Sequence, residues 1–497
     1  MVGPPPRAAN ASGGPCAAGL GYVDGLAHGA LEAGGHADRD ARRGPPRLAR
    51  GAGVRVPSMT GTAQVPQVRS APGYRRGKRF AAGGLAAAAI LLLPAAVAFW
   101  RADWGIVYVA WMLPLAELGL LLAGQLHYRY RYREAPGRFS ELIIQITTTG
   151  AEPGRVNEII SQIRGYNLKM GCRVWVVTEP GRPTDYPLAD DVLVVPASFA
   201  VRPRNKARAL EYSRLARSAL HLDRDDVKTL FLDDDVSVTQ RYIERAFNAD
   251  YDLSQGVITP RTAYSLWPLG HFVVSHADDF RTHACLVYCS VFQGILDRPL
   301  HVHGEGLAVT GRAERLITWD HPLVASEDLA FGQQARRHGL SWGWFHEYAE
   351  VTSPWSLGDF LIQRNRWLWG DVHAIRRRSV MPLSGAVLVS AKYILGILGL
   401  ACSAAGLYLR ATGRIPATAG ILNYAKLSVL SWVAVFFACG WIGASSAYGG
   451  RDDDCRLLSA VLAVLMLPAS VALTFAAVVI SLAQGDPRTF RTIRKTR

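Results

Sequence analysis

An apolar run at residues 229–232 leads directly into three carboxylates, Asp233, Asp234 and Asp235. Carboxylates this close together repel one another and lose hydration at the end of a buried strand, so they need a compensating cation. The simplest such cation is a hydrated Mg²⁺ or Mn²⁺ that also carries phosphate oxygens. Because side chains alternate along a strand, we expect Asp233 and Asp235 to share the metal and Asp234 to point elsewhere. The same tripeptide at residues 452–454 follows two glycines rather than a strand, and we interpret it as a hydrated loop.

A group of cations lies just before and inside the helix predicted over residues 205–221. Lys206 stands in its first turn, and Arg202 and Arg204 precede it. The partial positive charge of a helix N-terminus attracts phosphate, and these side chains reinforce that charge. The spacing therefore predicts a phosphate contact one helix before the acidic strand.

Two further carboxylates, Glu327 and Asp328, precede the helix predicted over residues 329–338, with Ser326 as its expected cap. Acidic residues in a first helical turn can be purely structural, because they complement the helix dipole. The functional interpretation makes Asp328 a general base, within reach of an acceptor hydroxyl, with Glu327 beside it.

A glycine-flanked acidic turn is formed by Gly304, Glu305 and Gly306. Its spacing differs from the dinucleotide-binding glycine fingerprint, but glycines here let the backbone approach a sugar or phosphate closely. His301 and His303 precede the turn at strand spacing without a third partner in the sequence. We therefore expect them to pack or hydrogen-bond rather than to bind metal.

A basic and aromatic helix that contains Gln363, Arg366 and Trp367 comes just before an apolar block. Such a helix is typical of a membrane interface, with tryptophan at the headgroup level. Arg366 can in addition hold a diphosphate, and Trp367 can stack on a sugar.

Seven cysteines without regular spacing give no disulfide framework. Cys285 and Cys289 lie one helical turn apart, but no second Cys or His pair follows at zinc-finger spacing. The sequence therefore predicts no zinc site.

The elements that must position these residues alternate between strand and helix. Residues 141–147, 173–177 and 192–195 are rich in β-branched and apolar residues, whereas residues 155–168 have helical spacing. Such alternation predicts an α/β fold with a mixed, mostly parallel sheet and helices on both faces. Ligands then bind at the carboxyl ends of the strands, where the acidic run stands.

Apolar residues make up 49% of the 497-residue chain and concentrate near its ends. Residues 1–75 form a Gly-, Pro- and Arg-rich tail that is predicted to be disordered. If Met59 is the true start of the chain, only a short basic leader precedes the first apolar block. The further predicted parts are a transmembrane hairpin at 80–126 (spans 80–100 and 104–126), a cytosolic domain at 135–380, a C-terminal transmembrane region at 383–482 (blocks 383–409, 421–448 and 457–482), and a basic tail at 483–497.

The net charge is +15, and its Lys and Arg residues cluster beside the apolar blocks rather than along one amphipathic face. Basic residues that flank membrane spans explain this charge better than nucleic-acid binding does. Basic residues on both sides of the hairpin predict an integral membrane protein whose soluble domain faces the cytoplasm. Five spans would place the basic tail outside, so either one block is re-entrant or the count is wrong. Glu117, inside the second span, is interpreted as a protonated carboxyl group that faces a neighbouring helix, with a functional role as the alternative.

These residues, in this order, resemble the signature of membrane-bound family 2 glycosyltransferases of the GT-A fold. The DxD, ED and QxxRW motifs of that family correspond to Asp233 with Asp235, Glu327 with Asp328, and Gln363 with Arg366 and Trp367. Within the class, residues 141–370, and especially 353–370, are similar to the Egghead-type β-1,4-mannosyltransferases.

The resemblance implies inverting transfer of mannose from the nucleotide sugar GDP-mannose to a lipid-linked acceptor. The residues then expected to bind the donor are Lys206, Arg204, Glu179 and Asp234. Those expected at the acceptor or the diphosphate are Gly304, Glu305, Gly306, Gln363, Arg366 and Trp367. The chain departs from the family where three threonines at 147–149 replace the carboxylate pair usual after the first strand, which leaves nucleobase contacts to Glu179.

Two other interpretations stay open. A processive polysaccharide synthase, using UDP-glucose or a similar donor, also carries the QxxRW motif. A non-catalytic membrane scaffold or transporter would use the domain only to bind a nucleotide sugar, although intact Asp233, Asp235 and Asp328 argue against it.

Overall fold

The computed structural model describes residues 113–182, 185–261, 268–414, 419–447, 453–487 and 493. The predicted tail at 1–75, the first predicted span at 80–100 and the start of the second lie outside the described residues. The strands are β1 (Glu141–Thr147), β2 (Gly171–Thr178), β3 (Asp191–Val194), β4 (Val227–Asp233), β5 (Val236–Val238), β6 (Leu253–Pro260), β7 (Leu307–Thr310) and β8 (Trp342–Val351).

The helices up to the end of the sheet are α3 (Leu113–Arg131), α4 (Pro153–Arg164), α5 (Asn205–Ala219), α6 (Gln240–Asn248), α7 (Leu269–Asp278), α8 (Phe280–His283), the π-helix η1 (Ala284–Cys289), α9 (Ser290–Phe292), α10 (Gly311–Leu316) and α11 (Glu327–Arg337). Those after the sheet are α12 (Leu357–Arg376), α13 (Leu383–Ala411), α14 (Ala419–Ala447), α15 (Asp453–Leu465) and α16 (Leu467–Gln484).

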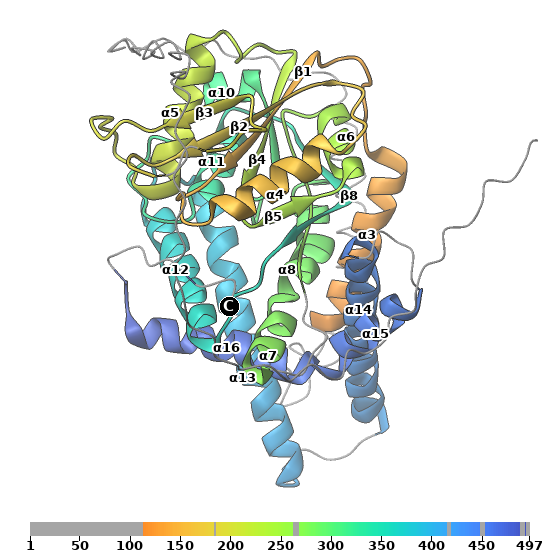
Figure 1. Cartoon of the computed structure of the whole chain (residues 1–497). Coiled ribbons are helices and arrows are strands. Elements are labelled where there is room, and N and C mark those ends of the chain that lie inside the picture. The colour runs from red at the N-terminus through yellow and green to blue at the C-terminus, as the bar shows by residue number, and fades with distance from the viewer. Residues whose placement is uncertain are drawn as a thin grey trace, which may run out of the picture. The chain divides into compact units, whose positions relative to one another are not determined.

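The strands form one sheet in the order β3-β2-β1-β4-β7-β6-β8-β5. Strands β1 to β4 run parallel to one another, and β6 and β8 are parallel to each other. Strand β7 is antiparallel to β4 and β6, and β5 is antiparallel to β8. The predicted mixed, mostly parallel α/β sheet is therefore confirmed (Figure 1).

Helices cover both faces of the sheet. Side chains of each strand point alternately to the two faces, so each face carries apolar residues that a helix can bury. Leu142 and Ile144 of β1 pack with Val156 and Ile160 of α4 in the largest apolar cluster. On the other face, Val177 of β2 packs in a smaller cluster that includes α5. The apolar residues of α4 recur at helical spacing, which explains why this segment forms a helix against the sheet.

Two described helices, α13 and α16, are long and apolar enough to cross a membrane by length and composition. Figure 1 shows α13 and α14 extending away from the sheet, and α16 packs against α12 and α7. The apolar block at 457–482 differs from the single helix expected there, since it forms α15 and α16, which meet at Met466. Pro468 lies in the first turn of α16, where a missing amide is tolerated. Asp453 begins α15, so the second acidic run starts a helix rather than lying in a loop.

Candidate active site

A cavity of about 1700 Å³ opens at the carboxyl ends of the central parallel strands. Thr147 at the end of β1 is in register with Val177 of β2 and Asp233 of β4, so these strand ends coincide. The predicted site residues that line the cavity are Glu179, Arg204, Lys206, Asp233, Asp234, Asp235, Glu305, Glu327, Asp328, Arg366 and Trp367. Gly304, Gly306 and Gln363 do not line it.

The acidic run turns away from the strand earlier than predicted. Strand β4 ends at Asp233, and Asp234 and Asp235 form the turn that leads into β5. Strand alternation therefore does not separate these side chains, and all three line the cavity. Oδ2 of Asp234 accepts a hydrogen bond from the Thr148 hydroxyl at 2.8 Å, so one of the unexpected threonines contacts the acidic turn directly.

The electrostatics of this turn favour a bound cation. Burial is the main cause that raises the pKa of Asp233 to about 7; Lys206 lowers it, while Glu305 and Asp235 add to the rise. Carboxylates that raise one another's pKa gain from a divalent cation, and oxygen is the ligand that Mg²⁺ and Mn²⁺ prefer. The side chains of Asp233 and Asp235 therefore fit the predicted metal.

Lys206 supplies the positive charge next to this turn. Its Nζ contacts the carboxylate of Asp233 and lies 3.9 Å from Oε1 of Glu327. Burial alone would lower the pKa of Lys206, but the neighbouring carboxylates of Asp233, Glu327 and Glu305 outweigh it and raise the pKa. The lysine is therefore a fixed cation at the position where a phosphate was predicted.

Asp328 stands in the first turn of α11 with both carboxylate oxygens engaged by backbone amides. Oδ1 accepts from the amide of Leu329 at 2.8 Å, and Oδ2 accepts from the amide of Gly304 at 2.9 Å. Burial raises the pKa of Asp328 to about 7, with further rises from Glu327 and Glu305 and a lowering by Lys206. A carboxylate with a pKa near neutrality is well matched to general-base catalysis.

Ser326 does not cap α11 as predicted. Its backbone lies in the left-handed region, with φ of 59°, and it makes no side-chain cap hydrogen bond. Its hydroxyl instead donates to Oδ1 of Asp371 in α12 at 2.9 Å. Asp371 also accepts from Tyr393 and Lys392 of α13, at 2.8 and 3.1 Å. An N-cap residue usually has an extended backbone, so the left-handed conformation of Ser326 explains why its hydroxyl does not cap the helix.

The glycine turn is shaped by two close approaches. A Cβ at Gly304 would lie 2.5 Å from Nζ of Lys206, so a larger residue there would displace the lysine head. Gly306 has φ of +74° and faces the core, where its carbonyl accepts from the Tyr242 hydroxyl at 2.7 Å. Gly306 therefore packs against the core and does not line the cavity, whereas Glu305 does.

Helix α12 carries Arg366 and Trp367 to the cavity, while Gln363 is buried within the fold with 2% of its surface exposed. Two guanidinium groups lie near the Trp367 ring. The Cζ atoms of Arg281 and Arg364 lie 4.7 and 4.4 Å from its centroid, within cation–π range.

Sequence reasoning missed the carboxylate that anchors these arginines. Asp278, fully buried at the end of α7, accepts from Nη2 of Arg364 at 2.6 Å and lies 3.3 Å from Nε of Arg281. Arg281 in turn lies 3.6 Å from Oε1 of Glu305. Asp278 and Arg364 are 86 residues apart, so no local spacing signals the contact.

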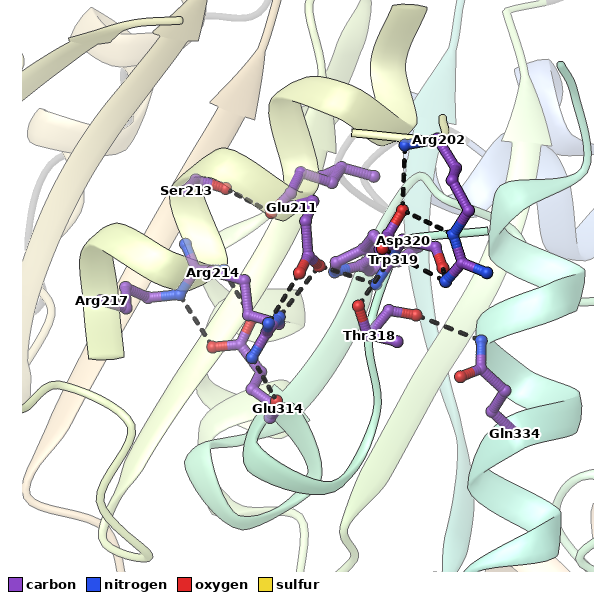
Figure 2. Close-up of polar contacts among 11 residues, drawn as sticks. Arg202, Glu211, Ser213, Arg214, Arg217, Glu314, Thr318, Trp319, Asp320 and Gln334 are labelled. Atoms are coloured by element: carbon purple, nitrogen blue, oxygen red, sulfur yellow. Dashed lines mark hydrogen bonds and ion pairs between the residues drawn. The ribbon is translucent and has the colours of Figure 1, made fainter. Parts of the chain in front are cut away.

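Glu179 also lines the cavity and is paired with Arg208 of α5 at 2.7 Å. Arg204 occupies the N-cap position of α5 and lines the cavity. Arg202 is directed elsewhere, since its guanidinium binds the side chain and carbonyl of Asp320 (Figure 2). The predicted phosphate contact therefore does not include Arg202.

A buried polar network fixes α5, and with it Lys206. Nε of Arg217, at the far end of α5, donates to Glu314 of α10 at 2.8 Å, and both side chains are almost fully buried. Glu211 accepts from Arg214 and from the Trp319 amide, the latter at 2.9 Å (Figure 2). Lys206 lies in the first turn of this anchored helix.

The other end of the cavity is apolar. Its walls there include Leu388 and Leu395 of α13, Val429 of α14, and Val471 and Phe475 of α16. Glu117 of α3 also borders it and accepts hydrogen bonds from Tyr288 and from Trp432, the latter at 2.9 Å. The carboxyl group thus faces α8, η1 and α14, in line with the interpretation that it faces neighbouring helices.

The sequence profile of the family described as Glycosyl transferase family group 2 matches residues 228–479, about half of the chain. The chain belongs to this family. The matched segment contains the acidic run, Asp328 and the α12 residues, and it continues through α13, α14 and most of α16. Family membership thus covers the acidic turn, the expected base and the apolar helices together.

Individual relatives are more distant. The beta-1,4-mannosyltransferase bre-3 of Caenorhabditis elegans is 27% identical over 217 residues, which are 40% of this chain and 45% of that protein. The beta-1,4-mannosyltransferase egh of Drosophila melanogaster is 24% identical over 313 residues, 61% of this chain and 66% of that protein. The chain therefore spans less than half the length of the nematode relative and about two thirds of the fly relative.

Two solved structures align with low scores. The mannosyltransferase PcManGT from Pyrobaculum calidifontis, in complex with GDP-Man and Mn²⁺, gives a TM-score of 0.39 at 15% identity and covers 73% of this chain and 98% of its own. TarS of S. aureus gives a TM-score of 0.30 at 8% identity, and the alignment covers 68% of this chain and 55% of TarS. Neither alignment assigns a role to a residue of this chain.

Proposed function

We propose that the chain is an inverting, metal-dependent glycosyltransferase that moves mannose from GDP-mannose to a lipid-linked acceptor at the cytoplasmic face of a membrane. The names of the nematode and fly relatives support mannose as the transferred sugar. The three arginines at 376–378, just before the apolar helix α13, support the cytoplasmic side.

One observation carries the proposal: the same cavity contains Asp233 and Asp328 and is walled by Leu388 of α13 and Val471 of α16. Burying an acyl chain against such a wall is favourable, by roughly 25 cal/mol per Å² of apolar surface. A lipid-linked acceptor can therefore bury its chain there and present its hydroxyl to the carboxylates. This placement raises the effective concentration of the acceptor at the site.

The side chains divide the reaction between them. Asp233 and Asp235 would hold Mg²⁺ or Mn²⁺, which offsets the charge of the leaving diphosphate when bound. Lys206 and Arg366 add positive charge beside that diphosphate. Asp328 takes the proton of the acceptor hydroxyl, whose oxygen bonds to the anomeric carbon as the carbon–diphosphate bond breaks on the opposite face.

The test is a donor screen on membranes that contain the full chain, with the mass of the lipid product measured. We expect one hexose to be added from GDP-mannose and none in membranes with the Asp328→Asn variant. A strong preference for UDP-glucose would contradict the assignment of mannose as the transferred sugar but not the proposed mechanism. A long polymeric product would indicate a processive synthase. Absence of transfer from every common donor with Mn²⁺ present would favour the non-catalytic alternative.

A further inference from the structure

Three side chains that can bind metal through sulfur or nitrogen gather next to the glycine turn. They are Cys285 and Cys289 of η1 and His303, which directly precedes Gly304. One ligand atom from each side chain lies within 4.8 Å of the other two, the one such group among the described residues. Both thiols are buried, and Sγ of Cys285 is 3.3 Å from Nε2 of His303.

The backbone brings the two thiols together in an unusual way. Residues Ala284–Cys289 form a π-helix, a rare element that occurs often at functional sites. The segment is buried against the sheet, and the amide of Ile258 in β6 donates to Sγ of Cys285 at 3.4 Å. An amide donor to sulfur stabilises a thiolate, which is the form that binds metal.

We propose that Cys285, Cys289 and His303 bind a zinc ion. Thiolates and imidazole select zinc over Mg²⁺ and Mn²⁺, which prefer oxygen. Ligands about 2.0–2.3 Å from a tetrahedral zinc lie roughly 3.5 Å from one another, a spacing compatible with this group. His303 borders the large cavity, from which a water molecule can supply the fourth ligand. A disulfide would account for the two cysteines but leaves the imidazole contact unexplained.

The position of the group gives it a structural consequence. A zinc ion there ties η1 to His303, and the next residue, Gly304, donates its amide to Asp328. The metal is thereby placed to hold the glycine turn against the expected base. The inference concerns metal binding alone and does not depend on the identity of the transferred sugar.

The experiment measures zinc in the purified full chain after gel filtration, by elemental mass spectrometry. We expect about one zinc per chain in the wild type, and at least about a tenfold lower content in the Cys285→Ser/Cys289→Ser double variant, because two of three protein ligands are lost. The matched control is Cys172→Ser, a free thiol on β2, which should retain the zinc.

If the double variant fails to fold, a second measurement on the wild-type protein tests the proposal. Cobalt is exchanged into the wild-type protein, and thiolate-to-cobalt absorption in the near ultraviolet is recorded before and after the thiols are alkylated in denaturant. Such absorption supports the proposal. Wild-type protein without zinc and without that absorption overturns it, as does zinc that persists in the double variant, or a mass two hydrogens lower that reports a Cys285–Cys289 disulfide.

Discussion

The backbone amide of Gly304 donates a hydrogen bond to Oδ2 of Asp328 at 2.9 Å. This bond joins the glycine turn to a carboxylate 24 residues further along the chain. The other oxygen accepts from the amide of Leu329 at 2.8 Å. A carboxylate held by two backbone donors has a fixed direction, and a substitution at this position changes both its charge and its hydrogen bond to the glycine turn.

Asp328→Asn should slow transfer by about 10²- to 10⁴-fold, the usual contribution of a general base, because the amide keeps the shape but cannot take a proton. Binding of GDP-mannose should change little. Initial rates on membranes and nucleotide-sugar binding to purified protein measure the two effects. Asp225→Asn, a surface carboxylate with 71% of its side chain exposed, is the matched control. Unchanged turnover in Asp328→Asn would remove the residue from the mechanism.

The pH dependence of transfer should follow the ionisation of Asp328. Its pKa is raised to about 7 by burial, Glu327 and Glu305, against Lys206. The base is active only when ionised, so kcat/KM should rise about tenfold per pH unit below that value and level off above it. The profile is measured at saturating Mn²⁺, because Asp233 also has a pKa of about 7. A flat profile from pH 5.5 to 8 would contradict this assignment.

Removal of divalent cations should abolish transfer, because Asp233 and Asp235 then face the diphosphate as uncompensated negative charge. Treatment of membranes with EDTA, followed by excess Mn²⁺ or Mg²⁺, measures loss and recovery. Asp233→Asn and Asp235→Asn should each fail to recover at metal concentrations that restore the wild type. Full activity in EDTA would exclude a metal at this turn.

Asp278 should act as a positioning residue, because it holds the two arginines that lie near Trp367. Asp278→Asn weakens its contacts with Arg281 and Arg364, which both lie within cation–π distance of the indole. Loss of a charged hydrogen bond costs about 1.5–3 kcal/mol, so kcat/KM should fall about 10- to 100-fold, with altered Trp fluorescence on donor binding. Asp359→Asn, in the first turn of α12, is the control. If both variants lose stability and activity in parallel, the role is structural only.

The buried pair of Arg217 and Glu314 should dominate the stability of the α5 network. Arg217→Met leaves a buried, uncompensated carboxylate and should cost about 3–5 kcal/mol in the free energy of unfolding. Arg202→Met breaks an ion pair in which the arginine side chain is 63% exposed, and should cost less than about 1 kcal/mol. Denaturant unfolding of the two variants measures the difference. Similar losses would show that burial does not set the strength of these pairs.

The sequence by itself determined the α/β fold class and most residues of the candidate site. Both rest on local patterns: apolar alternation and helical spacing mark the elements, and the acidic run, the Glu327–Asp328 pair and the α12 motif carry their chemistry in a few adjacent residues. Parallel strands bring their carboxyl ends to one edge of the sheet, and at that edge Asp233 lies against Lys206 of α5.

The tertiary structure alone decided the contacts between distant segments. The pairing of Asp278 with Arg364, the hydroxyl of Ser326 on Asp371, and the approach of His303 to Cys285 depend on how helices pack, and no spacing in the chain encodes them. Packing also turned Gly306 toward Tyr242 and divided the apolar block at 457–482 into two helices. Local patterns fix which face of an element is buried, but only the assembled fold fixes which side chains meet there.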